Sequence, residues 1–221
     1  LSLHDALPIS LTGYPRLIES KTLNPHKALE VFKRLSEKIG AEKVIWRYDP
    51  ILFSNLLPLD EHVRLFSKIA TELEGHTRRV VISFADFYQK TEKNLKAIDS
   101  LIYSDITQNH ELCLTLSQRL SEIARQHGLD IYSCAEEVNL TGQGIQHGKC
   151  IDEALINDLF GLLIPNSKDS GQREACGCVK SIDIGTYNTC LHGCQYCYAT
   201  HNQHQASSNF KKQDRKSTRL N

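Results

Sequence analysis

The sequence predicts an α/β fold, a partial (β/α) barrel of parallel strands that ends in a cysteine-rich loop. Short runs of β-branched and apolar residues alternate with longer stretches in which apolar residues recur at helical spacing. This alternation is typical of a parallel sheet with right-handed crossover helices. The strands are largely apolar, as expected when both faces of a parallel sheet are covered. An open sheet and a closed barrel both fit this pattern.

The first predicted elements are a strand end, a helix and a second strand. Residues 11–14 read as the end of a strand and lead into a Gly-Tyr-Pro turn. A helix is predicted over 25–38, because Asn24 is a favourable N-cap, proline suits the first helical position, and apolar residues recur at helical spacing until Gly40. The apolar run 44–48 is the next strand, and an Asp-Pro pair ends it.

The middle of the chain continues the same alternation. A helix over 60–73 carries its apolar residues on one face, and the run 80–84 is a strand. The polar stretch 88–109 is predicted to be helix and then loop. A helix over 110–127, marked by leucines at helical spacing, precedes the strand 129–134.

Two more elements are predicted in the carboxyl-terminal part, a short helix over 152–160 and a strand over 179–184 that leads into the cysteine loop. In parallel α/β folds, functional residues gather at the carboxyl ends of the strands. Arg47 and Asp49 lie at such an end, and we expect them to bind a cofactor at this rim. The other polar strand ends are residues 12–14, 83–86 and 134–137.

Both ends of the chain look foreign to the fold. Residues 1–10 resemble a translated sequencing adapter, and so does the tail from about Arg215. We therefore assign 1–10 as an adapter-like scar, 11–200 as one partial (β/α) domain with a cysteine-rich segment at 134–198, and 201–221 as a tail. On this interpretation, the natural protein has further residues before this domain.

The composition excludes several classes of function. The chain of 221 residues carries 26 Lys and Arg against 26 Asp and Glu, so bulk electrostatic binding to nucleic acid or anionic lipid is not expected. No apolar run approaches the ~18 residues of a membrane span, and no export signal is visible. We expect a cytoplasmic protein that does not act at a membrane. In that reducing compartment, clustered cysteines bind metal rather than form disulfides.

Three cysteines near the carboxyl terminus, Cys190, Cys194 and Cys197, have the spacing C-x3-C-x2-C. The irons of a [4Fe-4S] cluster lie about 3 Å apart, so its thiolates must come from a tightly curled loop. Gly193 permits that curl because glycine readily adopts positive φ. We expect these cysteines to bind three irons of a [4Fe-4S] cluster and to leave the fourth iron without a local protein ligand.

This loop resembles the signature of radical S-adenosylmethionine (SAM) enzymes, in which an aromatic residue precedes the third cysteine, as Tyr196 does here. The resemblance implies that SAM chelates the fourth iron and yields a 5′-deoxyadenosyl radical, with a flavodoxin or ferredoxin as electron donor. Tyr196 and Tyr198 are expected to shield the cluster from water. In those enzymes the loop follows the first barrel strand, whereas here it follows the last recognisable one. A circularly permuted barrel would reconcile the two arrangements.

Over residues 11–200 the chain resembles a bacterial family of unknown function. The shared segments are TGYP, VIWRYDP, VVISF, CAEE, GQR-x2-CGC and a loop that ends in YCYA. They stand at residues 12–15, 44–50, 80–84, 134–137, 171–178 and 190–199. The resemblance implies no particular substrate and leaves both a small molecule and a macromolecule open, and it singles out no catalytic residue.

Four further cysteines, Cys134, Cys150, Cys176 and Cys178, offer enough thiolates for an auxiliary site that holds a second cluster or zinc. Alternatively, Cys134 and Cys150 are small buried hydrophobic residues. Cys113 stands at a core position of a helix and is expected to be structural.

Two classes of function follow. The first is an iron–sulfur protein, a radical SAM-like enzyme of unknown substrate. The alternative is a zinc-binding or non-catalytic iron–sulfur module, with zinc held by Cys176, Cys178, Cys194 and Cys197. The loop spacing favours a cluster, because zinc does not need the extra cysteine. A simple electron carrier would not need so large a body.

Overall fold

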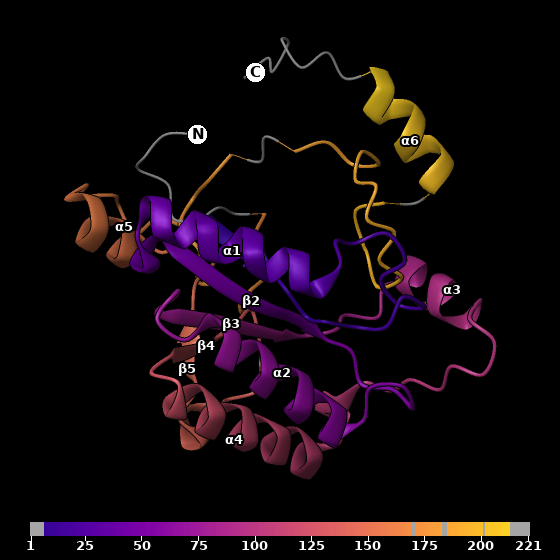
Figure 1. Cartoon of the computed structure of the whole chain (residues 1–221), viewed down its shortest axis with the longest axis horizontal. Helices are drawn as coiled ribbons and strands as arrows, with labels where there is room; N and C mark the ends of the chain where they lie inside the picture. Colours follow the sequence, from indigo (N-terminus) through magenta and orange to yellow (C-terminus); the bar gives the residue numbers. More distant parts are fainter. Residues whose placement is uncertain (1–6, 169–170, 183–184, 201, 213–221) are drawn as a thin grey trace.

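A parallel sheet forms the centre of the chain in the computed structural model, which describes residues 7–168, 171–182, 185–200 and 202–212 (Figure 1). Within these residues the sheet has five strands, which follow one another in sequence order. They are β1 Leu7–Ser10, β2 Val44–Ile51, β3 Arg79–Phe84, β4 Asp130–Cys134 and β5 Gln146–Gly148. The predicted α/β class is confirmed.

Side-chain caps explain where two of the long helices begin. α1 (Pro25–Ile39) starts at Asn24, whose side chain accepts a hydrogen bond from the backbone N–H of His26 at 3.0 Å. α4 (His110–Gln126) starts at Asn109, which accepts from Leu112 N–H at 3.1 Å. The other helices are α2 Leu59–Leu73, α3 Gln89–Lys96, α5 Glu153–Phe160 and α6 Gln203–Lys212, with short 3₁₀ turns at Ala41–Lys43, Ile106–Gln108 and Thr141–Gln143.

The helices α1, α2 and α4 pack on one face of the sheet, which we call the outer face. Trp46 and Tyr48 point to this face and share the main hydrophobic core with Phe32 of α1, Phe66 of α2 and Leu120 of α4. The strand order explains this arrangement. Right-handed crossovers between neighbouring strands that advance in one direction place every helix on the same side, whereas a doubly wound sheet has helices on both sides. The open sheet is therefore compatible with part of a (β/α) barrel.

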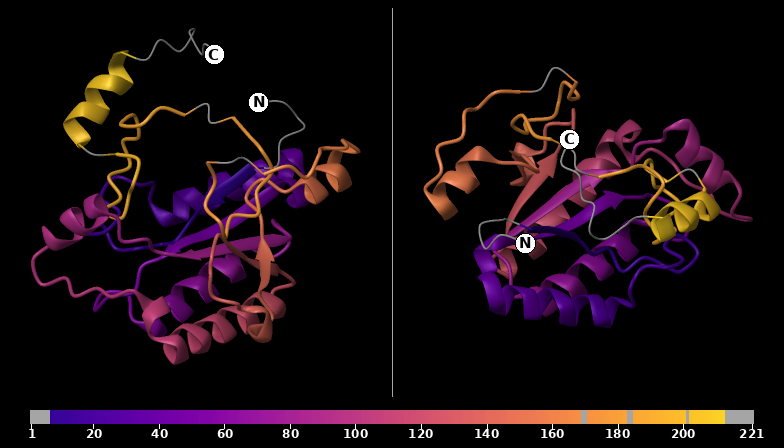
Figure 2. Two further views of the ribbon diagram at one scale, coloured as in Figure 1. Left: turned by 180° about the vertical axis from the view of Figure 1, so that it is seen from behind. Right: turned by 90° about the horizontal axis from the view of Figure 1, so that it is seen from above.

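The opposite face, which we call the inner face, carries a smaller apolar cluster. Its buried residues are Ile45, Val81 and Cys134, and Leu155 of α5 packs against them. The carboxyl-terminal segment, orange to yellow in Figures 1 and 2, runs over the side of the sheet opposite α2 and α4. In a closed barrel the inner face would line the interior, and barrel enzymes place their functional groups at the carboxyl ends of the strands that surround it.

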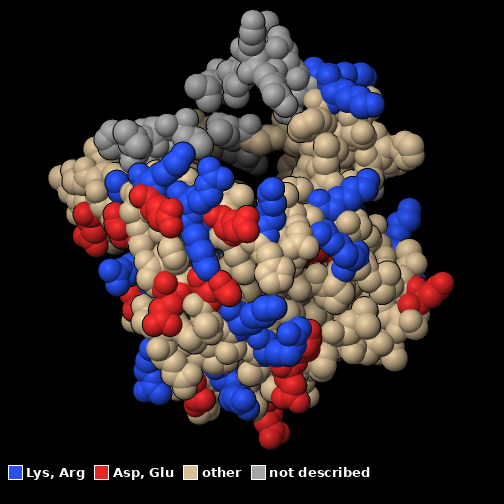
Figure 3. Space-filling view, in the orientation of Figure 1, with Lys and Arg blue, Asp and Glu red and all other residues tan. Residues whose placement is uncertain are grey.

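The surface seen in Figure 3 carries basic and acidic side chains interspersed with one another. This mixture agrees with the equal numbers of basic and acidic residues, 26 of each. In the described part of the chain, no helix has both the length and the apolar character needed to cross a bilayer.

The first strand lies earlier in the sequence than predicted. It is β1 at Leu7–Ser10, not the segment 11–14, and it pairs in parallel with β2. Leu11 extends the ladder by one hydrogen bond, from its N–H to the carbonyl oxygen of Arg47 at 3.0 Å. Part of the segment that we assigned as a scar thus lies in the sheet. A strand edge pairs through backbone groups and accepts extended chain of almost any sequence. The adapter origin of residues 1–10 stays a prediction.

Two carboxyl-terminal predictions were incomplete. The sequence gives no signal for β5, because Gln146–Gly148 is short and contains no β-branched or aromatic residue. The strand predicted over 179–184 is wrong in its described part, 179–182, and residues 183–184 lie outside the described residues. The backbone N–H groups of Val179 and Lys180 bond to loop carbonyl oxygens at 3.2 and 2.7 Å instead of to a strand.

Candidate metal centre

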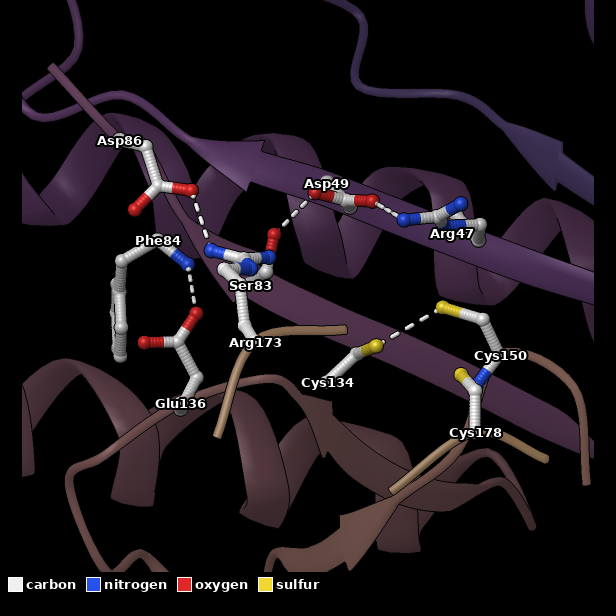
Figure 4. Close-up of polar contacts among 10 residues, drawn as sticks. All are labelled: Arg47, Asp49, Ser83, Phe84, Asp86, Cys134, Glu136, Cys150, Arg173 and Cys178. Atoms are coloured by element: carbon white, nitrogen blue, oxygen red, sulfur yellow. Dashed lines mark hydrogen bonds and ion pairs between the residues drawn. The ribbon is translucent and has the colours of Figure 1, made fainter. Parts of the chain in front are cut away.

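Three cysteine sulfurs converge on the inner face. The Sγ atoms of Cys134, Cys150 and Cys178, which we call the triad, all lie within 4.8 Å of one another. The sulfurs of Cys134 and Cys150 are 2.9 Å apart (Figure 4). Across the described residues, this is the only set of three or more His, Cys, Asp or Glu side chains whose ligand atoms are so close.

Each sulfur of the triad comes from a different part of the chain. Cys134 is the last residue of β4, and its sheet partner in β5 is Gly148, so Cys150 emerges beside it two residues later. The strands approach closely at Gly148, where an added Cβ would lie only 2.6 Å from Tyr132 Cβ. Cys178 is placed by its Sγ, which accepts hydrogen bonds from the backbone N–H groups of Cys150 at 3.2 Å and of the next residue at 3.4 Å.

The triad shares its protons unequally. Hydrogen bonds with Cys134 and Cys150 hold the pKa of Cys178 well below the ordinary thiol value. Hydrogen bonds with Cys150 and Cys178, together with burial, raise the pKa of Cys134. The bond with Cys134 lowers the pKa of Cys150, but the bond with Cys178 and burial raise it to about 11. A bound cation would displace the thiol protons of the triad, because metals bind cysteine as thiolate.

Arg47 supplies positive charge beside the triad. Burial would lower the pKa of Arg47, but the charges of Asp49, Cys150 and Cys134 raise it. Asp49 accepts from Arg47 and from the hydroxyl of Ser83, and Figure 4 shows this chain of contacts along β2 and β3. The two rim residues that we expected to bind a cofactor therefore contact each other next to the triad. Their cofactor role stays a prediction.

Glu136 is a partly buried carboxyl group that the sequence marked only as part of a polar strand end. Its Oε1 accepts a hydrogen bond from the backbone N–H of Phe84 at 2.7 Å. Burial raises the pKa of Glu136 to about 7. Arg173 and Asp86 form an ion pair at 2.7 Å in the same region (Figure 4). The carboxyl edges of β3 and β4 therefore carry charged groups in the neighbourhood of the triad.

The loop cysteines form a looser group. Cys190 is exposed, and Cys194 and Cys197 are partly buried. The three sulfurs do not all lie within 4.8 Å of one another. A cubane carries its thiolates on separate iron corners, so its ligands lie farther apart than those of a single ion. The assignment of a cluster to this loop stays a prediction. The expected positive φ of Gly193 is confirmed at 68°, and an added Cβ would lie 2.4 Å from Ser20 Oγ.

The loop is held against the carboxyl edge of the sheet. The N–H of Gln195 donates to the Ile18 carbonyl oxygen and the N–H of Lys21 to that of His192, both at 2.9 Å. Side chains of α3 add hydrogen bonds to three loop carbonyl oxygens. These anchors follow β1 and β3 in the sequence, so the loop lies where the carboxyl ends of the strands point.

Tyr196 anchors the loop to the interior. Its hydroxyl donates to Glu19 Oε1 at 2.5 Å, and that oxygen also accepts from Thr12 Oγ1 at 2.6 Å. Burial raises the pKa of Tyr196 well above its ordinary value. Burial also raises the pKa of Cys194 to about 12. Tyr198, in contrast, is 61% exposed. The predicted shielding of a cluster by both tyrosines stays a prediction.

The remaining cysteines separate into two cases. Cys176 lies outside the triad, although a hydrogen bond from it helps to lower the pKa of Cys178. Cys113 is buried in α4, where burial raises its pKa to about 11, in keeping with a structural role. The structure does not group Cys176 and Cys178 with Cys194 and Cys197, the set considered for zinc, in the part of the chain that it describes.

The fold and the site together define an α/β protein with a one-sided parallel sheet and a cysteine triad on the inner face that is able to bind metal. The chain belongs to the family described as domain of unknown function DUF1848, which matches residues 2–199. Comparison with the curated proteins and with the solved structures gave no match.

Proposed function

We propose that this protein is a metalloprotein that binds a metal ion through Cys134, Cys150 and Cys178. The observation that carries this proposal is the convergence of three sulfurs, from two neighbouring strand ends and a distant segment, within 4.8 Å. Close contact between neutral thiols contributes little to the stability of the fold. Thiolates that share a cation are strongly stabilised by it, and the free energy of metal binding then contributes to the stability of the fold.

The spacing of the triad favours a single ion. A tetrahedral zinc ion with Zn–S bonds of about 2.3 Å separates its sulfur ligands by ~3.8 Å. All three sulfurs lie within 4.8 Å of one another, and an ion between Cys134 and Cys150, now 2.9 Å apart, would move these two sulfurs outward by roughly 1 Å to reach this separation. The fourth position would be taken by Cys176, which contacts Cys178, or by a ligand from solution. Soft thiolate ligands select zinc or iron over magnesium and calcium.

The surroundings of the triad support a metal-bound state. Three thiolates around a divalent cation carry a net charge of −1, which is costly to bury without compensation. Arg47 lies close enough for its charge to interact with those of Cys134 and Cys150. Its Nε is buried and makes no hydrogen bond. A guanidinium in this place would balance the charge of the loaded site.

A second candidate function is an iron–sulfur cluster of the radical SAM type on Cys190, Cys194 and Cys197. The curl at Gly193 and the hydrogen bonds that dock the loop at the carboxyl edge of the sheet support it. A cluster with SAM on its open iron would supply a radical that abstracts hydrogen from a substrate, with a reduced flavodoxin or ferredoxin as donor. On this proposal the chain is an enzyme, and its substrate stays unknown.

Anaerobic purification of the full chain, with zinc, iron and sulfide measured per chain, tests both proposals. We expect Cys150→Ser to lose the triad metal and to keep any iron of the loop. Cys194→Ser should show the reverse. Cys113→Ser is the matched control, because Cys113 is a buried cysteine outside both sets. Full retention of zinc and iron in Cys150→Ser would refute the triad as a ligand set, and iron retention in Cys194→Ser would refute the loop.

A further inference from the structure

Two sulfurs of the triad lie closer together than ligation of a metal requires. Cys134 Sγ and Cys150 Sγ are 2.9 Å apart, whereas tetrahedral ligands of one zinc ion are separated by ~3.8 Å. Their backbones are also suitably placed for a bond between them. Cys134 pairs with Gly148 across β4 and β5, and Cys150 follows two residues later. The bond in a disulfide is about 2.05 Å long, so the two sulfurs, now 2.9 Å apart, need to approach by less than about 1 Å.

We propose that Cys134 and Cys150 form an oxidative modification site, at which a hydroperoxide converts the two thiols into a disulfide. Both cysteines are free in the described structure, so the reduced form is the one seen here. Cys150 is partly buried and Cys134 is 8% exposed. The oxidant therefore reaches Cys150 first, and Cys134 is the resolving cysteine.

The chemistry balances without any other reactant. The Cys150 sulfur attacks hydrogen peroxide, an S–O bond forms, the O–O bond breaks, and the departing hydroxide takes up the thiol proton as water. The Cys134 sulfur then attacks the sulfenic acid, an S–S bond forms, the S–O bond breaks, and a second water leaves. Two thiols and one peroxide give one disulfide and two waters. The short distance between the sulfurs makes the second step faster than further oxidation to sulfinic acid.

The disulfide would remove two of the three metal ligands. The remaining sulfur of the triad, Cys178, is held in place by hydrogen bonds from two backbone N–H groups, and it would then lack the two thiolates with which it shares the ion. Peroxide would then release the metal, and a dithiol reductant would restore binding. This consequence rests on the proposed metal site. The disulfide itself depends only on the placement of the two sulfurs.

The test treats the reduced, metal-free full chain with one equivalent of hydrogen peroxide, blocks the remaining thiols by alkylation, and maps disulfides by mass spectrometry of peptides. We expect a Cys134–Cys150 disulfide as the main product, in the wild-type chain and in Cys113→Ser alike. Cys150→Ser should not form it. Sulfinic acid at Cys150 without a disulfide, or disulfides distributed over the other cysteines, would overturn the proposal.

A parallel experiment loads the wild-type chain with Zn²⁺ and follows release with a colorimetric chelator. We expect about one zinc released per disulfide formed, with binding recovered after reduction. Zinc retained in the disulfide form would overturn the coupling between oxidation and release. Failure of the reduced chain to bind Zn²⁺ would refute a zinc site, and the disulfide map would still decide the modification site by itself.

Discussion

A buried histidine in α2 predicts how the stability of this protein depends on pH. His62 is fully buried in the main core. Its Nε2 lies 3.2 Å from the carbonyl oxygen of Leu52, which can only accept, so Nε2 carries the proton. Nδ1 of the neutral ring then accepts from the hydroxyl of Tyr48 at 2.9 Å. Both ring nitrogens are satisfied without charge, and burial lowers the pKa of His62 to about 4.

The sign and size of the effect follow from this pKa. An unfolded chain binds a proton at His62 below about pH 6.5, whereas the folded chain excludes it until pH falls to about 4. The stabilisation is therefore complete above pH 6.5 and decreases as the pH falls through that interval. Between pH 7.5 and pH 5 the expected loss from this residue is ~2 kcal/mol in the free energy of unfolding.

Urea unfolding at the two pH values measures this loss. The chain has a single tryptophan, Trp46, and it is fully buried against Phe66, so its fluorescence reports on the core. The comparison is between reduced, metal-free wild type and His62→Gln, whose amide can contact the same two partners without titrating. The exposed residue His26 gives the matched control, His26→Gln. Between pH 7.5 and pH 5, the free energy of unfolding of His62→Gln should decrease by ~2 kcal/mol less than that of wild type or His26→Gln. Equal losses in all three would refute the reasoning.

Three substitutions test the supports of the two cysteine sets. Gly193→Ala forces a side chain onto a φ of 68°; we expect a loss of roughly 1 kcal/mol and faster hydrogen exchange in the loop, and unchanged exchange would contradict the proposed curl. Tyr196→Phe removes the donor to the buried Glu19; urea unfolding should show a loss of about 1–3 kcal/mol, and an unchanged midpoint would count against the anchor. Gly148→Ala places a Cβ 2.6 Å from Tyr132 Cβ; it should separate β4 from β5 and reduce the metal content measured at the triad, so wild-type metal content would count against this packing.

The helices and the central strands were predictable because their signals are local. The periodicity of apolar residues places helices at 25–38, 60–73 and 110–127, and the structure has α1, α2 and α4 there. The strands 44–48 and 80–84 were apolar runs between helices, and they form β2 and β3. Such patterns indicate which face of a helix or strand is buried, and the residues of the element itself are enough to show this.

The triad was only partly predictable, because its members meet through long-range packing. The sequence suggested a metal site on Cys134, Cys150, Cys176 and Cys178, and three of these four converge. Cys150 reaches Cys134 through β5, a strand with no sequence signal. Cys178 is placed by hydrogen bonds between loops. Contacts of this kind join residues far apart in the chain, so they leave no repeating pattern of apolar residues in the sequence.

The two cysteine sets differ in what fixes them, and this difference separates their chemistry. Cys134 ends β4, and Cys150 lies two residues beyond the paired strand β5, so the pairing of these strands holds their sulfurs close together. That rigidity suits one small ion and equally suits a disulfide. The loop from Cys190 to Cys197 is instead held by hydrogen bonds to its backbone, with its sulfurs farther apart. Such a loop can spread its thiolates around a larger inorganic core. A chain that loses the triad metal on oxidation should therefore keep its loop contacts, because no element of the sheet edge that anchors the loop depends on the sulfurs of the triad.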